Sequence, residues 1–190
     1  MKNEELYATA VELRILGGIV MKLVRRDVEQ HLEACGAEIG SLQHGVLRLL
    51  SQQHFTIAEL SRKMMLEAAT LVPVIDALEK SSLVKRGQDP HDRRRTPLTL
   101  TERGAELVAR IPSASPDGML VKSLRKMGDD KAEQLLQRLR ELVTLLTEDE
   151  NIVREISASV RRDVDENKKS GSKVKQVAKT KLISKDKVLA

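Results

Sequence analysis

Between Leu6 and Cys35 the apolar residues recur at steps of three and four positions. This is the spacing of one face of a helix, so it predicts a long amphipathic helix that ends at Gly36. The pair Gly17 and Gly18 lies inside this helix, where each glycine costs about 1 kcal/mol relative to alanine. Either a close crossing by another helix or a local weak point explains the pair.

Two short helices are predicted next. The first follows Gly40, carries apolar residues at helical spacing and is closed by residues 54–55. The second begins at the segment from Thr56 to Glu59, which is a capping box. In this motif the threonine hydroxyl accepts a hydrogen bond from the amide three residues on, and the glutamate reaches back. We expect this helix to end near Met64.

A further helix follows a turn at residues 65–67. Proline is tolerated in the first turn of a helix but disrupts its interior, so Pro73 places the cap of this helix at Ala69 or Thr70. A short helix, a tight turn and a second helix in this order are typical of a helix-turn-helix.

Residues 83–86 and 96–100 are predicted to form two short strands. The polar and basic segment between them, residues 87–95, is then the tip of a hairpin. A hairpin directly after a helix-turn-helix is a wing. Thr101 is expected to cap a helix that continues to about Ile111.

Helical spacing resumes at Met119 after a break at residues 112–116, and it continues in a helix expected to be capped by Asp129. A further short helix is expected over residues 152–164. Ser, Gly and Lys dominate the remainder, to which we assign no structure. The expected fold class is therefore mainly α with a small β-hairpin wing.

The composition excludes several kinds of functional site. Of the 190 residues 41% are hydrophobic but only 1% are aromatic, which argues against a base-stacking surface and an aromatic-lined cofactor pocket. A single cysteine excludes an intrachain disulfide framework, and the four histidines show no metal-ligand spacing. We expect no cofactor, no metal and, without a phosphate loop or nucleophile elbow, no enzyme.

No apolar stretch approaches the roughly 18 residues of a membrane span, and the chain does not begin with a signal-peptide pattern. We therefore expect a cytoplasmic protein with no membrane partner. Residues 42–104 hold 10 basic against 7 acidic side chains, and residues 165–190 hold 8 lysines against 3 acids. Two basic regions on a mixed helical body predict a polyanion partner, first of all nucleic acid. The lysine-rich tail either adds nonspecific DNA affinity or is a solubilising extension.

Several segments of the helix-turn-helix and the wing carry a specific residue pattern. In the helix-turn-helix they are Glu59-Leu60-Ser61, Thr70-Leu71-Val72-Pro73 and Leu78-Glu79-Lys80. In the wing and its exit they are Asp89-Pro90-His91-Asp92-Arg93-Arg94, Leu98, Leu100-Thr101 and Gly104, the most specific part. Across residues 39–104 the sequence resembles the MarR (multiple antibiotic resistance regulator) family of winged-helix transcription regulators.

The resemblance implies a homodimer on double-stranded DNA, with two winged domains in successive major grooves. It also implies an N-terminal dimerisation helix (1–38), a winged helix-turn-helix DNA-binding domain (39–111) and C-terminal dimerisation helices (117–164). The composition of residues 165–190 adds a basic, disordered tail. Many family members bind phenolic effectors. Because this chain has no aromatic cluster to stack on such a ring, the existence of a small-molecule effector stays open.

The resemblance further implies which side chains contact DNA. The wing arginine of the family enters the minor groove and a wing aspartate holds it, roles that fall to Arg94 and Asp92 here. A planar cation suits the negative potential of a narrow groove. Phosphate contacts are expected from the other basic side chains of this region, Arg62, Lys63, Lys85, Arg93 and Arg95.

The recognition helix offers little for direct reading of bases, because its outward positions carry no Arg, Asn or Gln. We expect its contacts to come from Thr70, Val72 and Pro73. Asp76 would repel the DNA backbone unless it is paired. Ser82 stands where the family has a glycine in the left-handed conformation, which is a local cost.

Cys35 lies at the end of the first helix, whereas the peroxide-sensing members of the family carry their cysteine near its start. We therefore favour a structural thiol over a redox sensor. The function predicted is a dimeric DNA-binding transcriptional repressor. Two alternatives stay open: an architectural DNA binder of low sequence specificity, and a winged helix used for protein–protein contact through Val72 and Pro73.

Overall fold

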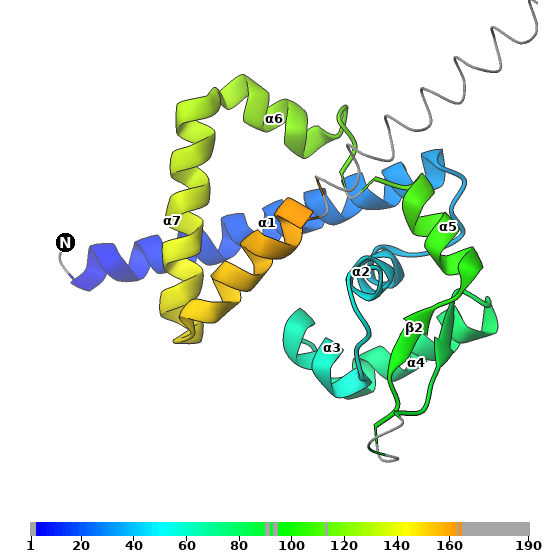
Figure 1. Ribbon diagram of the computed structural model, residues 1–190. Coiled ribbons are helices and arrows are strands. Elements are labelled where there is room, and N and C mark those ends of the chain that lie inside the picture. Colours follow the sequence, from blue (N-terminus) through cyan, green and yellow to red (C-terminus); the bar gives the residue numbers. More distant parts are fainter. Residues whose placement is uncertain (1–2, 90–91, 93–94, 113, 163, 165–190) are drawn as a thin grey trace, which may run out of the picture. The chain divides into compact units, whose positions relative to one another are not determined.

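The computed structural model describes residues 3–89, 92, 95–112, 114–162 and 164. The chain divides into two compact units, Met1–Ala132 and Glu133–Ala190. The first unit contains α1 (Asn3–Ala34), α2 (Ser41–Leu50), α3 (Ile57–Met64), α4 (Ala68–Lys80), β1 (Val84–Arg86), β2 (Leu98–Leu100), α5 (Glu102–Arg110) and α6 (Met119–Met127) (Figure 1). The mainly helical fold class with a small hairpin, predicted from the hydrophobic pattern, is confirmed.

Helix α1 is the long helix that the spacing of apolar residues predicts. It ends where expected, because Gly36 takes a φ of 64°, a left-handed conformation that glycine adopts without strain. A Cβ added at Gly17 or Gly18 would meet no atom within 4 Å among the described residues. No close crossing within the described chain therefore explains this pair.

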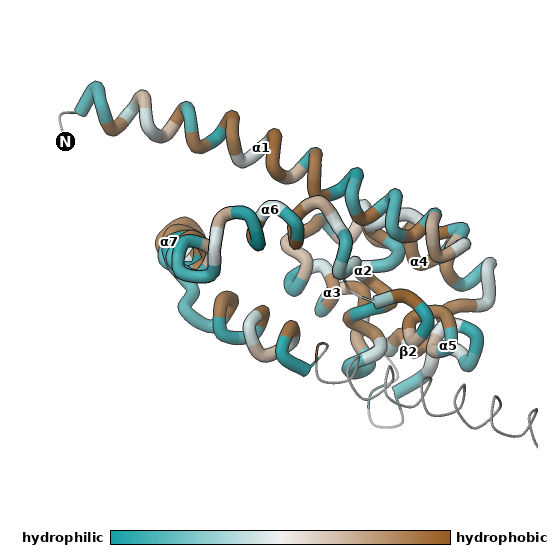
Figure 2. The backbone as a smooth tube through the Cα atoms, turned by 90° about the horizontal axis from the view of Figure 1, so that it is seen from above, coloured by the Kyte–Doolittle hydropathy of each residue, from teal (hydrophilic) through white to brown (hydrophobic). Residues whose placement is uncertain are grey.

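The hydrophobic core lies in the winged part of the first unit, which is formed by α2 to α5 and the two strands. Its buried side chains are Val46, Leu47, Leu50, Phe55, Leu60, Leu71, Ile75, Leu78, Leu83, Val84, Leu98 and Val108. In Figure 2 the hydrophobic segments of these elements gather in one region, whereas those of α1 recur along the helix between polar turns. The core therefore positions the helix-turn-helix and the wing relative to each other.

The start of α4 differs from the prediction. The helix begins at Ala68 with Glu67 as its N-cap, so the expected caps Ala69 and Thr70 lie inside it. Pro73 is likewise inside the helix rather than in its first turn.

The reason is that tertiary packing outweighs the cost of the proline. Pro73 has no amide hydrogen for the carbonyl of Ala69, but both residues are exposed, so water can solvate that carbonyl. On the opposite face Leu71, Ile75 and Leu78 are fully buried in the core and hold this helix in place.

The two strands pair antiparallel, with Arg86 opposite Leu98 and Val84 opposite Leu100. Both are shorter than expected by one or two residues. Leu98 also donates its amide to the carbonyl of Phe55 at 2.8 Å, which ties the sheet to the segment that enters α3. Ser82, at the turn before β1, has a φ of 56°, which confirms the left-handed conformation expected there.

The exit from the wing explains one glycine of the sequence pattern. Thr101 caps α5 as predicted, because its hydroxyl accepts a hydrogen bond from the amide of Gly104 at 3.1 Å. A Cβ built at Gly104 would lie 2.1 Å from the carbonyl oxygen of Leu83. Only glycine therefore allows α5 to pack this closely against the segment that enters β1.

Helix α6 is capped by a distant side chain. Its N-cap residue is Gly118, and Asp27 of α1 accepts hydrogen bonds from the amides of Met119 (2.9 Å) and Leu120 (3.4 Å). Helix α7 (Asp129–Thr147) starts directly after Gly128, whose φ of 88° ends α6. Asp129 is thus the first residue of α7 and not its cap, which corrects the prediction.

The second unit begins inside α7 and continues with helical residues 150–162, where a short helix was expected. Its apolar side chains are largely exposed; they include Leu135, Leu136, Leu139, Leu145, Leu146, Ile156 and Val160. Among the helices that the structure describes, none combines the length and the apolar composition needed to cross a membrane. The tail at 165–190 lies outside the described residues.

Candidate nucleic-acid interface

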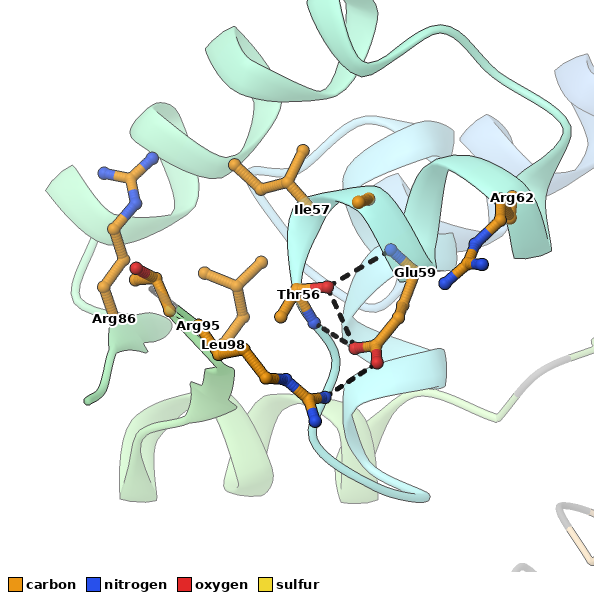
Figure 3. Close-up of a pocket in the computed structure, with 9 residues that line it drawn as sticks. Thr56, Ile57, Glu59, Arg62, Arg86, Arg95 and Leu98 are labelled. Carbon is orange, nitrogen blue, oxygen red and sulfur yellow. Dashed lines mark hydrogen bonds and ion pairs between the residues drawn. The ribbon is translucent and has the colours of Figure 1, made fainter. Parts of the chain in front are cut away.

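The N-terminus of α3 carries the capping box predicted from the sequence. The amide of Glu59 donates to the hydroxyl of Thr56 at 3.3 Å, and the amide of Thr56 donates to Oε2 of Glu59 at 2.7 Å (Figure 3). These two reciprocal bonds satisfy amides that the first turn of a helix leaves without partners. The start of the first helix of the helix-turn-helix is therefore firmly set.

Glu59 has a second role that the sequence did not show. Its other oxygen, Oε1, accepts a hydrogen bond from Nη2 of Arg95 at 2.8 Å. The pKa of Glu59 is lowered, chiefly by the hydrogen bond from the Thr56 amide, with contributions from Arg95 and Arg62. The carboxylate thus stays charged and joins α3 to the wing.

Arg95 also lies next to a carboxylate of the wing itself. Its Nε is 3.7 Å from Oδ2 of Asp89, and its backbone amide donates to the carbonyl of Asp92 at 2.9 Å. Asp92 in turn donates its amide to Oδ1 of Asp89 at 3.3 Å. These contacts hold the two arms of the wing together beyond the strands. Arg93 and Arg94, two further predicted DNA contacts, lie outside the described residues.

The recognition helix α4 presents Thr70, Val72 and Pro73 as exposed side chains, as the counting of faces predicts. Asp76 is paired: Arg86 of β1 contacts it at 2.7 Å and contacts Glu79 at 2.6 Å. The hydrogen bond with Asp76 is the main cause that raises the pKa of Arg86. Asp76 is therefore paired, as a position facing DNA requires.

Sequence reasoning missed Arg86 because nothing local connects it to α4. The signal that could have found it is Asp76 itself, an acid on a DNA-facing helix that requires a cation nearby. Arg86 stands on β1, the first strand after that helix.

The remaining predicted contacts are distributed over α3 and β1. Arg62 and Lys85 are exposed, whereas Lys63 is half-buried with its ammonium 5.7 Å from the centre of the Phe55 ring. Arg62, Arg86 and Arg95 line one hollow of about 520 Å³ between the start of α3 and the wing (Figure 3). Basic side chains from three elements thus gather beside the helix-turn-helix.

His44 of α2 is a buried polar side chain. Burial, followed by the charges of Arg48 and His31, lowers the pKa of His44 to about 4. Its Nε2 and the Nε2 of His31 have no hydrogen-bond partner among the described residues. Cys35 has a free, half-buried thiol.

A helix-turn-helix followed by a two-stranded wing, with basic side chains around both, defines the winged-helix class of DNA-binding proteins. Residues 41–96 match the MarR family. The HTH-type transcriptional repressor NicR of Pseudomonas putida is 30% identical over 136 residues, which cover 68% of this chain and 83% of NicR. This chain therefore belongs to the MarR family.

Two further comparisons agree with this assignment. The HTH-type transcriptional regulator SarZ of Staphylococcus haemolyticus is 29% identical over 70 residues, 37% of this chain, and the match spans about half of SarZ (48%). The solved structure of reduced AbfR bound to DNA is 26% identical with a TM-score of 0.56, covering 77% of this chain and 99% of that one.

Proposed function

We propose that this chain is a dimeric transcriptional regulator that binds double-stranded DNA and acts as a repressor. The observation that carries the proposal is the winged helix-turn-helix, whose exposed face on α4 is flanked by basic side chains of α3 and β1. Family membership supports it, as do the name of NicR, a transcriptional repressor, and the structure of AbfR bound to DNA.

In the proposed complex α4 lies in the major groove and the wing in the minor groove. Thr70, Val72 and Pro73 contact the DNA from α4, and Arg94 enters the minor groove with Asp92 as its support. Phosphate contacts come from basic side chains around this face, namely Arg62, Lys63, Lys85 and Arg93. The neutralisation of Asp76 by Arg86 supports this placement, because an unpaired acid on α4 would repel the DNA backbone.

The dimer part of the proposal rests on apolar side chains that a single chain leaves exposed. On α1, Leu13, Leu16 and Ile19 are about half exposed, and α7 exposes further leucines. Apolar faces of this extent on a water-soluble regulator favour burial against a second copy. We assign residues 1–38 and 117–164 to dimerisation and residues 39–111 to DNA binding.

The same family membership supports a non-enzymatic role and, because transcription takes place there in bacteria such as those of its relatives, a cytoplasmic location. We propose that no cofactor takes part in DNA binding. A small-molecule effector stays an open part of the proposal.

One observation favours a second candidate, an architectural DNA binder. The exposed face of α4 offers Thr70, Val72 and Pro73 but no Arg, Asn or Gln for bidentate contact with a base edge. Affinity would then rest on phosphate contacts and DNA shape, with little preference for one site.

Fluorescence anisotropy separates these functions. The full chain is titrated onto labelled duplex from upstream of its own gene at about 150 mM salt, with unlabelled random duplex as competitor. A regulator prefers its site by about 10³-fold or more, so its signal survives the competitor. Equal removal by random duplex identifies the architectural binder, and absence of duplex binding refutes both functions. Lys85→Gln, which removes one proposed phosphate contact, should weaken binding to all sequences equally and lower the salt slope of the binding constant by about 1.

A further inference from the structure

Arg95 occupies a position that a simple DNA contact does not require. Its guanidinium lies between two carboxylates from different elements, Glu59 at the start of α3 and Asp89 in the outgoing arm of the wing. Glu59 is 36 residues away in sequence, so this pair joins the returning arm of the wing to the helix-turn-helix.

The surrounding backbone brings this arm to α3. Leu98 donates its amide to the carbonyl of Phe55, which directly precedes the capping residue Thr56. Gly87 donates its amide to the carbonyl of Pro97 at 2.8 Å, so the pairing of the two arms continues beyond the strands. The base of this arm therefore lies beside the start of α3, and the Arg95 side chain adds a contact three residues before Leu98.

The two carboxylate oxygens of Glu59 accept hydrogen bonds from different residues. Oε2 accepts from Thr56 and completes the capping box, whereas Oε1 accepts from Arg95 (Figure 3). The orientation of the arm is thus linked to the same carboxylate that fixes the first turn of α3. Any rotation of this arm relative to α3 breaks the bond to Oε1 while the cap remains.

The contacts of Arg95 argue against a phosphate contact. Its guanidinium faces two carboxylates, with Nη2 2.8 Å from Oε1 of Glu59 and Nε 3.7 Å from Oδ2 of Asp89. A phosphate at this point would compete with Glu59 and Asp89 for the same donors. Arg62, which lines the same hollow and has no hydrogen bond to these acids, is the better phosphate contact there.

We infer that Arg95 is a positioning residue: it holds the wing against the helix-turn-helix through Glu59 and Asp89 and does not contact the DNA backbone. This inference rests on the proposed function as a DNA-binding regulator. It replaces the phosphate contact that sequence reasoning assigned to Arg95.

The first experiment uses the free protein. A spin label is attached at the exposed Gln88, as Gln88→Cys in a Cys35→Ser background, and its mobility is measured by electron paramagnetic resonance. Arg95→Gln and Glu59→Gln should each narrow the lines of the spectrum, because either substitution releases the wing and makes the label more mobile. Glu59→Gln is suitable because glutamine also forms a capping box. Lys85→Gln, an exposed cation on β1, is the matched control and should leave them unchanged. Unchanged lines for Arg95→Gln would overturn the inference.

The second experiment is a double-mutant cycle for duplex binding. Arg95→Gln should weaken binding about two- to five-fold in the wild-type background and have almost no effect in the Glu59→Gln background. Arg95→Lys should rescue only in part, since lysine cannot span both acids. Lys85→Gln should weaken binding equally in both backgrounds.

A phosphate contact gives a different result. Arg95→Gln would then weaken binding equally in both backgrounds and reduce the logarithmic salt slope by about 0.9, which would overturn the inference. Absence of duplex binding by the wild-type protein would refute the proposed function alone, because the spin-label measurement still decides the positioning role.

Discussion

Helix α1 and the winged part of the first unit are built from the same aliphatic residue types, yet they bury them to different extents. In the winged part Leu47 and Ile75 are completely buried, whereas on α1 Leu16 and Ile19 remain 49% and 50% exposed. The spacing of apolar residues is helical in both regions. The difference lies in what each helix packs against.

This comparison shows that an amphipathic pattern alone does not tell whether the partner face belongs to the same chain. The winged part closes its own core because its short helices and its hairpin surround α2. Helix α1 packs on α2 and α6 near its C-terminal end, where Leu32 is its one buried residue. The rest of its apolar face is available to the second copy of our proposal.

The largest effect is expected inside the closed core. Leu47→Ala removes a fully buried side chain and leaves a cavity, so it should lower the free energy of unfolding by about 3 kcal/mol. Urea denaturation followed by circular dichroism measures this. The exposed Val72→Ala on α4 is the control and should change stability by less than about 0.5 kcal/mol. Equal effects of the two changes would contradict a core closed within one chain.

A substitution on α1 tests whether its exposed apolar face is buried against a second copy. Ile19→Asp should raise the dimer dissociation constant by at least about 30-fold, because each of two copies loses about 1 kcal/mol of apolar burial. Sedimentation equilibrium over a dilution series measures the constant. Glu12→Gln, a polar change on the same helix, should leave it unaltered, and a wild-type protein that is monomeric throughout would refute the dimer.

The residue between the two regions, His44 of α2 near His31 of α1, should make stability depend on pH. Its pKa is lowered from 6.5 to about 4, so between these values the unfolded chain binds the proton and the folded chain does not. Stability is therefore full above about pH 6.5 and falls as the pH drops, by about 2 kcal/mol at pH 5. Urea midpoints at about pH 7.5 and pH 5 measure this loss, and His44→Leu should remove most of it.

The smallest effect is expected at Ser82. Its φ of 56° is a conformation that glycine adopts more easily, so Ser82→Gly should raise the free energy of unfolding by about 0.5 kcal/mol. The hydrogen bond that its backbone carbonyl accepts from Thr101 is kept. A small upward shift of the melting temperature checks this, and a decrease would show that the Ser82 side chain stabilises the turn.

The elements that sequence reasoning predicted correctly depend on local signals. Thr56 and Glu59 lie three positions apart, as do Thr101 and Gly104, and both motifs begin the expected helices. The left-handed conformation at Ser82 was likewise expected, from the glycine that the family has at this position. Such signals need no knowledge of the tertiary structure.

The errors and omissions depend on contacts between distant residues. The start of α4 was misplaced because the buried side of that helix outweighs the local preference of Pro73. The partners of Arg86 and Arg95 lie on other elements, so the sequence alone did not reveal the pair of Arg86 with Asp76 or the pair of Arg95 with Glu59. The expected roles of Thr70, Val72 and Lys85 stay predictions until DNA binding is measured.

The cap on α6 has a consequence for the order of folding. The first amides of α6 depend on Asp27, which stands 92 residues earlier than Met119, whereas Gly118 has no side chain to offer. During synthesis Asp27 leaves the ribosome long before these amides exist. The acceptor for the first turn of α6 is therefore present on α1 before α6 is synthesised, so α1 can stabilise this turn as soon as it forms.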